Sequence, residues 1–259
     1  EGGGGAREMI QDGLFDKFPM QAVYGMHNWP GLEVGKFAVS AGPVMASSNE
    51  FKITIHGKGS HAALPHNGID PVPVACQMVQ AFQTIISRNK KPVDAGVISV
   101  TMIHTGEATN VVPDHCEMQG TVRTFTTEVL DMIEQRMREV ANHTCAAFGA
   151  TCTFEFERNY PPTINHAAET QFAKEVMHSI VGENNVVVQE PTMGAEDFSY
   201  MLQAKPGVYC FIGNGDGVHR EIGHGEGPCT LHNPNYDFND ELIPLGGTYW
   251  VKLVEAALT

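Results

Sequence analysis

The sequence is poor in cations. Its 259 residues include 16 Lys plus Arg against 30 Asp plus Glu, which gives a formal net charge of −14 at pH 7. Binding to a nucleic-acid backbone needs clustered cations, so this balance argues against DNA or RNA as a partner. No apolar run approaches the roughly 20 residues that a membrane-spanning helix needs, so we expect no membrane partner either.

Closely spaced cysteine pairs are also absent. In a chain of this length, cysteines without a Cys-x-x-Cys pair are typical of buried free thiols in a reducing compartment. We therefore expect a cytoplasmic protein. The sequence begins at Glu1 rather than Met, in what resembles the end of a strand, so we expect further residues upstream and leave a targeting segment open. The six cysteines are Cys76, Cys116, Cys145, Cys152, Cys210 and Cys229.

The glycine run from Gly2 to Gly5 lacks the Gly-Lys-Ser/Thr sequence of a phosphate-binding loop. A nucleotide site is therefore not expected there. Tight packing of the backbone beside a site explains the run better, because glycine allows close approach.

Helices that alternate with short apolar strands predict an α/β layer fold. Between residues 50 and 158 the predicted order is β-α-β-β-α-β, that of a ferredoxin-like split unit. We interpret this unit as a domain inserted into a larger one. The expected boundaries are 1–48 and 160–259 for the two parts of the outer domain and 49–159 for the insertion.

Three residues from distant loops could form a metal site. His27 follows the apolar run Ala22-Val23-Tyr24, which is typical of a buried strand. It therefore lies where a strand gives way to a loop, and strand ends are where ligands bind in open α/β sheets. Glu1 and His232 also lie in predicted loops, and carboxylates and imidazoles suit zinc, manganese and related ions. Taken singly, each is better explained as an ordinary polar loop residue.

Seven motifs in a fixed order change that interpretation. Together they resemble the metallo-amidohydrolase family of aminoacylases, hippurate hydrolases, auxin-conjugate hydrolases and carboxypeptidase G, in its hippurate hydrolase branch. The resemblance covers essentially the whole chain. The motifs are Glu1-Gly2-Gly3-Gly4-Gly5-Ala6, Gly25-Met26-His27-Asn28, Gly57-Lys58-Gly59-Ser60-His61-Ala62-Ala63, Asn110-Val111-Val112-Pro113, Gly120-Thr121-Val122-Arg123, Gly194-Ala195-Glu196-Asp197-Phe198 and His232-Asn233-Pro234.

The resemblance implies a fold and an activity. The fold is a two-metal catalytic domain, an α/β sandwich with a mixed sheet, whose inserted ferredoxin-like domain acts as a lid and dimerises. The activity is metal-dependent hydrolysis of the amide bond of an N-acyl amino acid, which releases a carboxylic acid and an amino acid. The implied cofactors are two divalent ions (Zn, Mn, Co or Ni), and the implied assembly is a homodimer through the lid.

The resemblance also implies roles for single residues of the metal site. Glu1 matches the second glutamate of a metal-binding Glu-Glu pair, and His27 and His232 match metal-binding histidines. The first glutamate of the pair, which is the family's general base, would stand before Glu1. That glutamate and an upstream Cys-Gly-His metal motif are not in this sequence, so the ligand set is incomplete as given.

The predicted lid residues match positions that contact the substrate in members of this family. His61 matches the histidine that polarises the scissile carbonyl, usually in the partner subunit's site. Asn110 and Arg123 match residues that hold the substrate and its carboxylate. Glu196 and Asp197 match a loop near the substrate, where a site-lining role and a helix-capping role both stay open.

Other interpretations remain possible. The chain could be a catalytically incompetent remnant whose lid still dimerises and whose site binds ligand weakly. It could also be a small-molecule binding protein that borrowed the fold. The remaining histidines match no reliable ligand motif: His56 and His104 are expected to be structural, and His219 and His224 are expected in a solvated loop.

Overall fold

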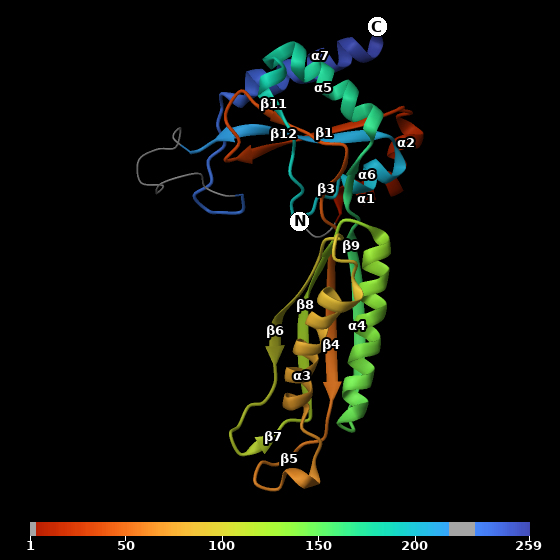
Figure 1. Ribbon diagram of the computed structural model, residues 1–259, viewed down its shortest axis with the longest axis vertical. Coiled ribbons are helices and arrows are strands. Elements are labelled where there is room, and N and C mark those ends of the chain that lie inside the picture. The colour runs from red at the N-terminus through yellow and green to blue at the C-terminus, as the bar shows by residue number, and fades with distance from the viewer. Residues whose placement is uncertain (1–3, 218–230) are drawn as a thin grey trace. The chain divides into compact units, whose positions relative to one another are not determined.

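The computed structural model describes residues 4–217 and 231–259 (Figure 1). The chain divides into two compact units, and each is described by itself. Unit 1 contains Met45–Pro162 and Met193–Glu196, and unit 2 contains Gly5–Val44, Thr163–Thr192 and the rest of the chain from Asp197. The predicted α/β class with mixed sheets is confirmed. No helix in the described part of the chain is long and apolar enough to cross a membrane.

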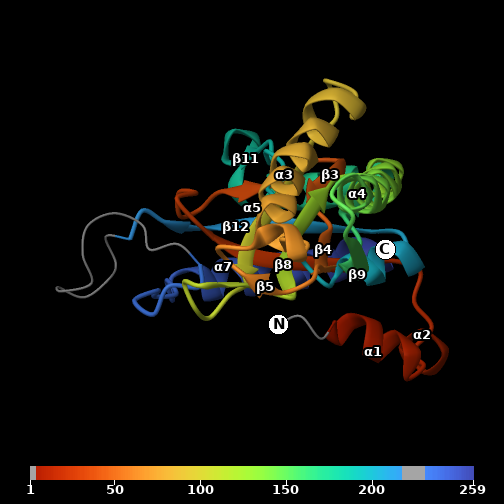
Figure 2. The same ribbon diagram turned by 90° about the horizontal axis from the view of Figure 1, so that it is seen from below.

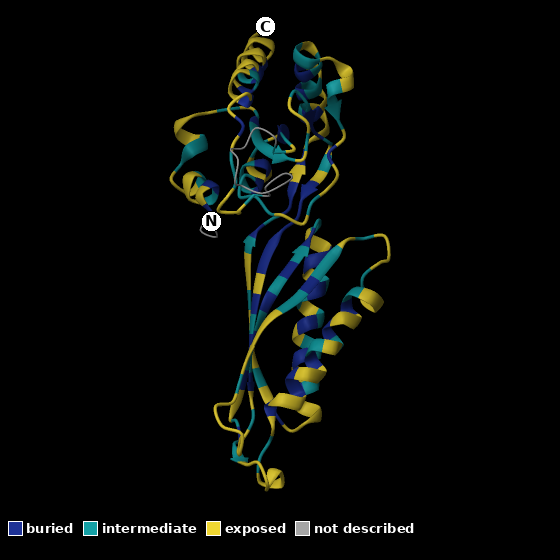
Figure 3. Ribbon diagram, turned by 90° about the vertical axis from the view of Figure 1, so that its left-hand side faces the viewer, coloured by how far each residue is buried: buried dark blue, intermediate teal, exposed yellow. Residues whose placement is uncertain are grey.

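Unit 1 is a four-stranded antiparallel sheet in the order β6-β8-β4-β9, with α3 and α4 packed on one of its faces (Figures 1 and 2). Strict alternation in β4 places Phe51, Ile53 and Ile55 in the core under the helices, while Lys52 and Thr54 face the other side. Figure 3 shows the buried face along the strands and helices. The elements are β4 (Ser48–His56), α3 (Pro71–Thr84), β6 (Gly96–His104), β8 (His115–Thr124), α4 (Thr127–Ala147) and β9 (Thr151–Tyr160).

Two short strands lie at the far end of unit 1, by which we mean the end opposite Met45 and Pro162, where the chain enters and leaves the unit. They are β5 (Ser60–His61) and β7 (Val111–Val112), which pair antiparallel with each other. The short helix η1 (Pro65–Asn67) follows β5, and the π-helical turn η2 (Ile85–Asn89) continues α3. Unit 1 therefore ends in a cluster of loops opposite the point where the chain enters at Met45 and leaves at Pro162.

Gly120 marks a tight contact in the centre of this sheet. A Cβ atom added there would lie 2.0 Å from the Ser99 carbonyl oxygen and 2.6 Å from the Phe51 ring. We expect Gly120→Ala to lower the free energy of unfolding by about 1–3 kcal/mol, because the backbone and the ring must both shift. The matched control is Gly247→Ala in α7, where nothing lies within 4 Å. That change replaces an exposed helical glycine and should raise the free energy of unfolding by about 0.5–1 kcal/mol. Urea denaturation measures the free energy of unfolding of both variants. An unchanged value for Gly120→Ala would contradict the tight packing around Gly120.

Unit 2 contains a mixed sheet in the order β1-β12-β2-β11. β1 and β12 are parallel, as are β2 and β11, whereas β12 and β2 are antiparallel. Helices α5 and α7 pack against each other and against β12, where the rings of Phe37 and Tyr249 lie in the core. The sheet strands are β1 (Val23–Pro30), β2 (Phe37–Ala38), β11 (Val186–Val187) and β12 (Gly207–Gly215), and the two helices are α5 (Ala167–Val181) and α7 (Leu242–Leu258).

The smaller elements of unit 2 complete its layers. α1 contacts α2 and α6, and Gly13 separates α1 from α2 in a left-handed conformation, with φ 86°. The remaining elements are α1 (Gly5–Gln11), α2 (Leu14–Lys17), α6 (Ser199–Ala204), η3 (Glu183–Asn185) and the paired strands β3 (Gly42–Met45) and β10 (Thr163–Asn165).

Candidate active site

His27 lies within β1, three residues before the strand ends at Pro30, and not in a loop after the strand as the sequence predicted; its side chain is half-buried. Its ring atom Nδ1 is 2.7 Å from the Asn28 carbonyl oxygen. A carbonyl oxygen only accepts hydrogen bonds, so Nδ1 carries the proton and donates it. In the neutral ring Nε2 then holds a free lone pair, which is the form in which an imidazole binds a metal. The structure therefore fixes His27 in a metal-binding tautomer.

Gly25, two residues before His27, leaves room for the Tyr209 ring of the neighbouring strand β12. A Cβ atom at Gly25 would lie 2.6 Å from the Tyr209 ring, on which the Phe198 ring also packs. The glycine of the Gly-Met-His-Asn motif is thus required by packing, whatever the role of the histidine.

The loop that carries His232 is held by hydrogen bonds to residues near the carboxyl ends of β1 and β12. The Asn28 amide donates a hydrogen bond to the Tyr236 hydroxyl. From β12, the Asn214 amide donates to the Asp237 carbonyl at 3.2 Å, and the Asn214 Oδ1 accepts from the Asn239 N–H at 3.0 Å. Burial, aided by the Asp237 carboxylate, raises the pKa of Tyr236, so its hydroxyl stays protonated. These contacts hold the loop of His232 against β1, which carries His27, and against β12.

His232 has an unusual backbone. Its φ of 64° makes it the one non-glycine residue with positive φ in the described ranges 4–217 and 231–259. Such a conformation costs of order 1–3 kcal/mol and persists where the surroundings impose it, often at a functional site. The exposed side chain of His232 is therefore set by the loop's geometry rather than by local preference.

Two of the three predicted metal ligands, His27 and His232, lie among the described residues. Glu1, the third predicted ligand, lies outside them. Among residues 4–217 and 231–259, no three His, Cys, Asp or Glu side chains gather closely enough to hold a metal ion. Catalytic zinc sites use three protein ligands, so His27 and His232 fit such a site chemically but need ligands from elsewhere.

His61 has the opposite tautomer to His27. Its Nδ1 accepts a hydrogen bond from the backbone N–H of Ala63 at 3.0 Å. Nδ1 is therefore unprotonated, and in the neutral ring the proton lies on Nε2. The exposed His61 thus presents an N–H donor, which is the group needed beside a carbonyl oxygen that gains negative charge.

The structure brings His61 and Asn110 together. β5 and β7 pair so that His61 lies opposite Val111, and the Ala62 N–H donates to the Asn110 carbonyl at 2.9 Å. Both residues line one cavity of about 1090 Å³ at the far end of unit 1. His104 and His115, for which the sequence indicated no site role, line it as well. No sequence signal marks them, because the strands that carry them meet only in the fold.

Arg123 lies elsewhere in unit 1. It is half-buried near the carboxyl end of β8 and faces the side of the sheet that carries no helices. Burial lowers the pKa of Arg123, and the nearby Glu50 carboxylate opposes that shift. An arginine side chain is not deprotonated in proteins, so the guanidinium stays charged.

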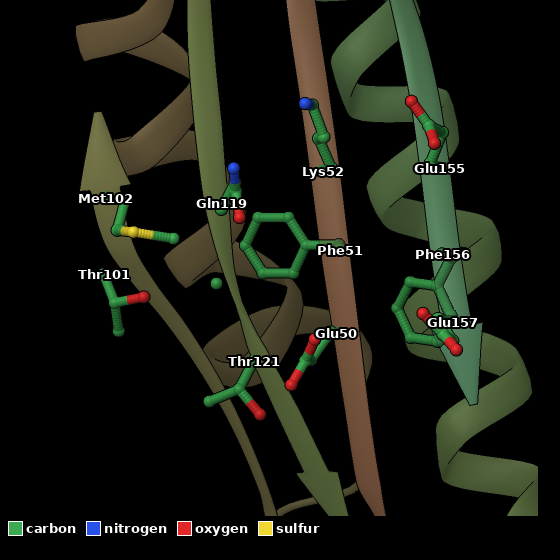
Figure 4. A pocket seen from close by; sticks show the side chains of 11 residues that line it. Glu50, Phe51, Lys52, Thr101, Met102, Gln119, Thr121, Glu155, Phe156 and Glu157 are labelled. Atoms are coloured by element: carbon green, nitrogen blue, oxygen red, sulfur yellow. The ribbon is translucent and has the colours of Figure 1, made fainter. Parts of the chain in front are cut away.

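Glu50 also lines a pocket of about 510 Å³ on this face, where Figure 4 shows the charged side chains of Lys52, Glu155 and Glu157 beside the apolar ones of Phe51, Met102 and Phe156. The Lys52 ammonium is paired there with the Glu117 carboxylate at 2.6 Å.

His61 and Arg123 are therefore far apart in one chain. His115, which shares the cavity of His61, opens β8, and Arg123 lies near the other end of that strand. At about 3.4 Å per residue, these two positions of β8 are roughly 27 Å apart. A small substrate held by His61 cannot also reach Arg123 of the same unit.

The loop before α6 shows a helix-capping contact of Asp197, while a site-lining role for this residue stays a prediction. Asp197 accepts a hydrogen bond from the Ala6 N–H at 2.8 Å, in the first turn of α1. Its carboxylate therefore satisfies a free N–H at the positive end of that helix. Glu196 is half-buried beside it, and its role in substrate binding stays a prediction.

Comparison with known proteins shows the family. The model of peptidase family M20/M25/M40 matches residues 1–256. The chain belongs to this family.

The similar proteins are longer than this chain. It is 40% identical over 219 residues to the N-acetyl-L-cysteine deacetylase of Bacillus subtilis, which covers 85% of the chain and 51% of that protein. It is 33% identical to the hippurate hydrolase of Campylobacter jejuni, over 98% of the chain and 63% of that protein. A dinuclear-metal-binding M20 peptidase from Bacillus subtilis has a similar structure, with a TM-score of 0.76 and 29% identity over 96% of the chain and 60% of its own. The chain thus spans between half and two thirds of these relatives.

Proposed function

We propose that the full-length protein is a metal-dependent amidohydrolase that splits N-acyl amino acids into a carboxylic acid and an amino acid. The observation that carries the proposal is the pair of opposite histidine tautomers. His27 offers a lone pair on Nε2, as a metal ligand must, and His61 offers a proton on Nε2, as a donor to a carbonyl oxygen must. Relatives named as a deacetylase and a hippurate hydrolase support this class of substrate.

In this proposal His27 and His232, with Glu1, hold part of a site for two divalent ions such as Zn, Mn, Co or Ni. Two such ions activate a water molecule and polarise the substrate's carbonyl group. The M20 relative that binds a dinuclear metal supports the number of ions. His27 is oriented by its bond to Asn28, and Asn28 ties the strand to the His232 loop through Tyr236.

His61 and Arg123 act on the substrate in different ways. The Nε2–H of His61 donates to the oxygen of the scissile carbonyl as it becomes negative, an interaction worth about 3–4 kcal/mol in the transition state. Arg123 grips the α-carboxylate through two parallel hydrogen bonds. Asn110 and Glu196 complete the substrate contacts.

The separation of His61 from Arg123 supports a site built by two subunits. The two residues lie at opposite ends of unit 1, so one substrate can meet both only if they belong to different copies of the chain. We therefore propose a homodimer formed through unit 1, in which His61 and Asn110 serve the partner's metal site. The free thiols of the described cysteines support a reducing compartment, the cytoplasm.

The direct test is hydrolysis by the full-length protein. Purified protein loaded with Zn, Mn, Co or Ni is incubated with N-acetyl and N-benzoyl amino acids, and release of the free amino acid is measured. We expect turnover that EDTA abolishes and metal restores. Absence of turnover across acyl groups, amino acids and metals, in a protein that retains bound metal, would contradict the proposal.

Tyr236→Phe tests the hydrogen bond that joins β1, the strand of His27, to the loop of His232. It removes the hydroxyl that accepts from Asn28 but keeps the ring. We expect metal affinity of the full-length protein to fall about tenfold, the lower end of effects seen when groups that orient metal ligands are removed. Competition with a chromophoric chelator measures the affinity. Phe238→Leu, at an exposed position of the same loop, is the control and should change nothing. Equal affinities in both variants would show that this hydrogen bond does not support the site.

A further inference from the structure

The corner between α4 and β9 in unit 1 holds two cysteines. Cys145 is buried in the last turns of α4, and Cys152, the second residue of β9, is half-buried. Both are free thiols. Cys145 belongs to the hydrophobic core of the unit, and Cys152 packs against that core. Neither thiol takes part in the proposed hydrolysis.

The chain reverses sharply between the two cysteines. The Ala150 N–H donates a hydrogen bond to the Cys145 carbonyl at 2.9 Å. The Gly149 N–H donates to the Ala146 carbonyl at 3.1 Å, and Gly149 is left-handed, with φ 74°. These features form a Schellman motif, a turn that satisfies carbonyl groups at the end of a helix. β9 therefore starts beside the end of α4 that carries Cys145.

β9 then runs back alongside α4 (Figure 1). The Arg138 guanidinium donates to the Phe154 carbonyl at 3.3 Å and lies over the Phe154 ring, 4.6 Å from its centre. Closer to the turn, the Cys152 thiol donates to the side-chain oxygen of Asn142 at 3.6 Å. The Cys152 sulfur therefore faces the last turns of α4.

The positions of Asn142 and Ala150 relate the two thiols to each other. Asn142 and Cys145 are neighbours on the surface of α4, because residues three apart on a helix lie side by side. Ala150 and Cys152 lie on the same side of the extended chain, since side chains alternate along it. Asn142 contacts Cys152, and Ala150 is buried with its N–H on the Cys145 carbonyl. The helix face and the strand face that carry the two thiols are therefore packed against each other.

The two thiols differ in how readily they lose a proton. A hydrogen bond from the Cys145 thiol lowers the pKa of Cys152, although burial opposes this shift. The same hydrogen bond and burial both raise the pKa of Cys145. Cys152 is also the more exposed of the two. Since the thiolate is the reactive form of cysteine, Cys152 is the nucleophile of the pair and Cys145 is the thiol beside it.

We propose that Cys145 and Cys152 form a reversible disulfide when unit 1 meets hydrogen peroxide or an organic hydroperoxide. The packed corner of α4 and β9 carries the proposal, because it holds the two side chains against each other in the folded protein. A reactive thiol with a second thiol next to it is the arrangement found in redox-sensing cysteines. The disulfide does not depend on the proposed hydrolysis, and an inactive protein would form it as well.

With hydrogen peroxide the reaction has two steps. The Cys152 thiolate attacks one peroxide oxygen, the O–O bond breaks, and the other oxygen leaves as hydroxide and takes up a proton to become water. Cys152 is then a sulfenic acid. The Cys145 sulfur next attacks the Cys152 sulfur, the S–O bond breaks, and the departing hydroxide takes the Cys145 proton to become a second water. The two thiols are oxidised, the peroxide is reduced, and a dithiol reductant reverses the change.

The disulfide has two consequences for unit 1. A sulfenic acid without a neighbouring thiol can be oxidised further to a sulfinic acid, which is not readily reduced, so Cys145 protects Cys152 from lasting damage. The bond also ties α4 to β9 across a short loop, and a cross-link of this kind stabilises by restricting the unfolded chain.

Peptide mapping of the full-length protein tests the proposal. Trypsin cuts after Arg138 and Arg158, so Cys145 and Cys152 are the cysteines of one peptide, residues 139–158. The protein is treated with hydrogen peroxide, free thiols are blocked with iodoacetamide, and the digest is analysed by mass spectrometry. We expect this peptide to lose two hydrogens and take up no iodoacetamide, and dithiothreitol to restore both thiols. Two blocked thiols in the peroxide-treated protein would overturn the proposal.

Two variants separate the roles of the thiols. Cys145→Ala leaves Cys152 without a partner, so dimedone, which reacts with sulfenic acids, should label Cys152 in this variant and not in the unchanged protein. Cys76→Ser, at an exposed cysteine of α3, is the matched control and should still form the disulfide. Equal labelling of Cys152 in the unchanged protein and in Cys145→Ala would show that Cys145 does not react with the sulfenic acid.

Thermal unfolding provides an independent readout. Peroxide should raise the Tm of the full-length protein by roughly 4–8 °C, and dithiothreitol should return it to the starting value. Cys152→Ser lacks the nucleophile, so peroxide should not raise its Tm. An equal response of the two proteins to peroxide would contradict a disulfide that ties α4 to β9.

Discussion

Full-length His61→Ala and His232→Ala variants, each nearly inactive alone, are expected to recover about a quarter of wild-type activity when they are mixed. Loss of a donor to the developing oxyanion costs about 10²–10³ in kcat, so the His61 variant alone should be close to background. Loss of His232 removes a proposed metal ligand. Random pairing makes about half of the dimers mixed, and each mixed dimer has one intact site out of two.

The expectation follows from the position of His61. Its cavity lies at the far end of unit 1, roughly 27 Å along β8 from Arg123. A site that needs both residues must combine them from two copies. In the mixed dimer, the subunit with an intact His232 then receives an intact His61 from its partner.

A matched pair of variants controls for this result. His27→Ala and His232→Ala both damage the proposed metal site of their own subunit, so mixing them should restore nothing. Subunit exchange is verified with differently tagged chains. If exchange occurs and the His61 and His232 variants also fail to recover activity, His61 does not act across the dimer.

Arg123→Ala in the full-length protein should raise KM strongly for substrates with a free α-carboxylate. The lost charge-assisted pair is worth about 1.5–3 kcal/mol, which corresponds to roughly a 10- to 150-fold increase. Carboxamide analogues lack the charge that the pair recognises, so their KM should change little. Because the guanidinium is half-buried and charged beside Glu50, removal of its charge acts directly on this recognition.

Arg123→Lys separates charge from geometry in the same assay. Lysine keeps the charge but cannot form two parallel bonds, so an intermediate KM is expected. Equal increases in KM for carboxylate and carboxamide substrates would remove Arg123 from the carboxylate-binding role. A change in kcat without a change in KM would do the same.

The regular elements were largely predictable from the sequence. The order β-α-β-β-α-β predicted between residues 50 and 158 corresponds to β4, α3, β6, β8, α4 and β9, because strands and helices with one buried face have recognisable apolar periods. Gly13, in a left-handed conformation, separates α1 from α2, because its backbone cannot continue the helical hydrogen bonds.

The geometry of the candidate site was less predictable. The bond from Asn28 to Tyr236 joins residues far apart in sequence, and no local pattern signals it. The opposite tautomers of His27 and His61 depend on single backbone groups, the Asn28 carbonyl and the Ala63 N–H. Motifs can indicate that both histidines act, but only the fold assigns the proton on each ring.

Metal content measured by mass spectrometry after gel filtration tests the central claim most directly, that His27 and His232 are part of a two-metal site. The full-length protein should retain two divalent ions per subunit, and its His27→Ala and His232→Ala variants fewer. This chain alone should hold at most one weakly bound ion, since a missing bridging ligand leaves two cations mutually repelling. Two tightly bound ions in this chain, or an unchanged count in a full-length protein that lacks both histidines, would contradict the account.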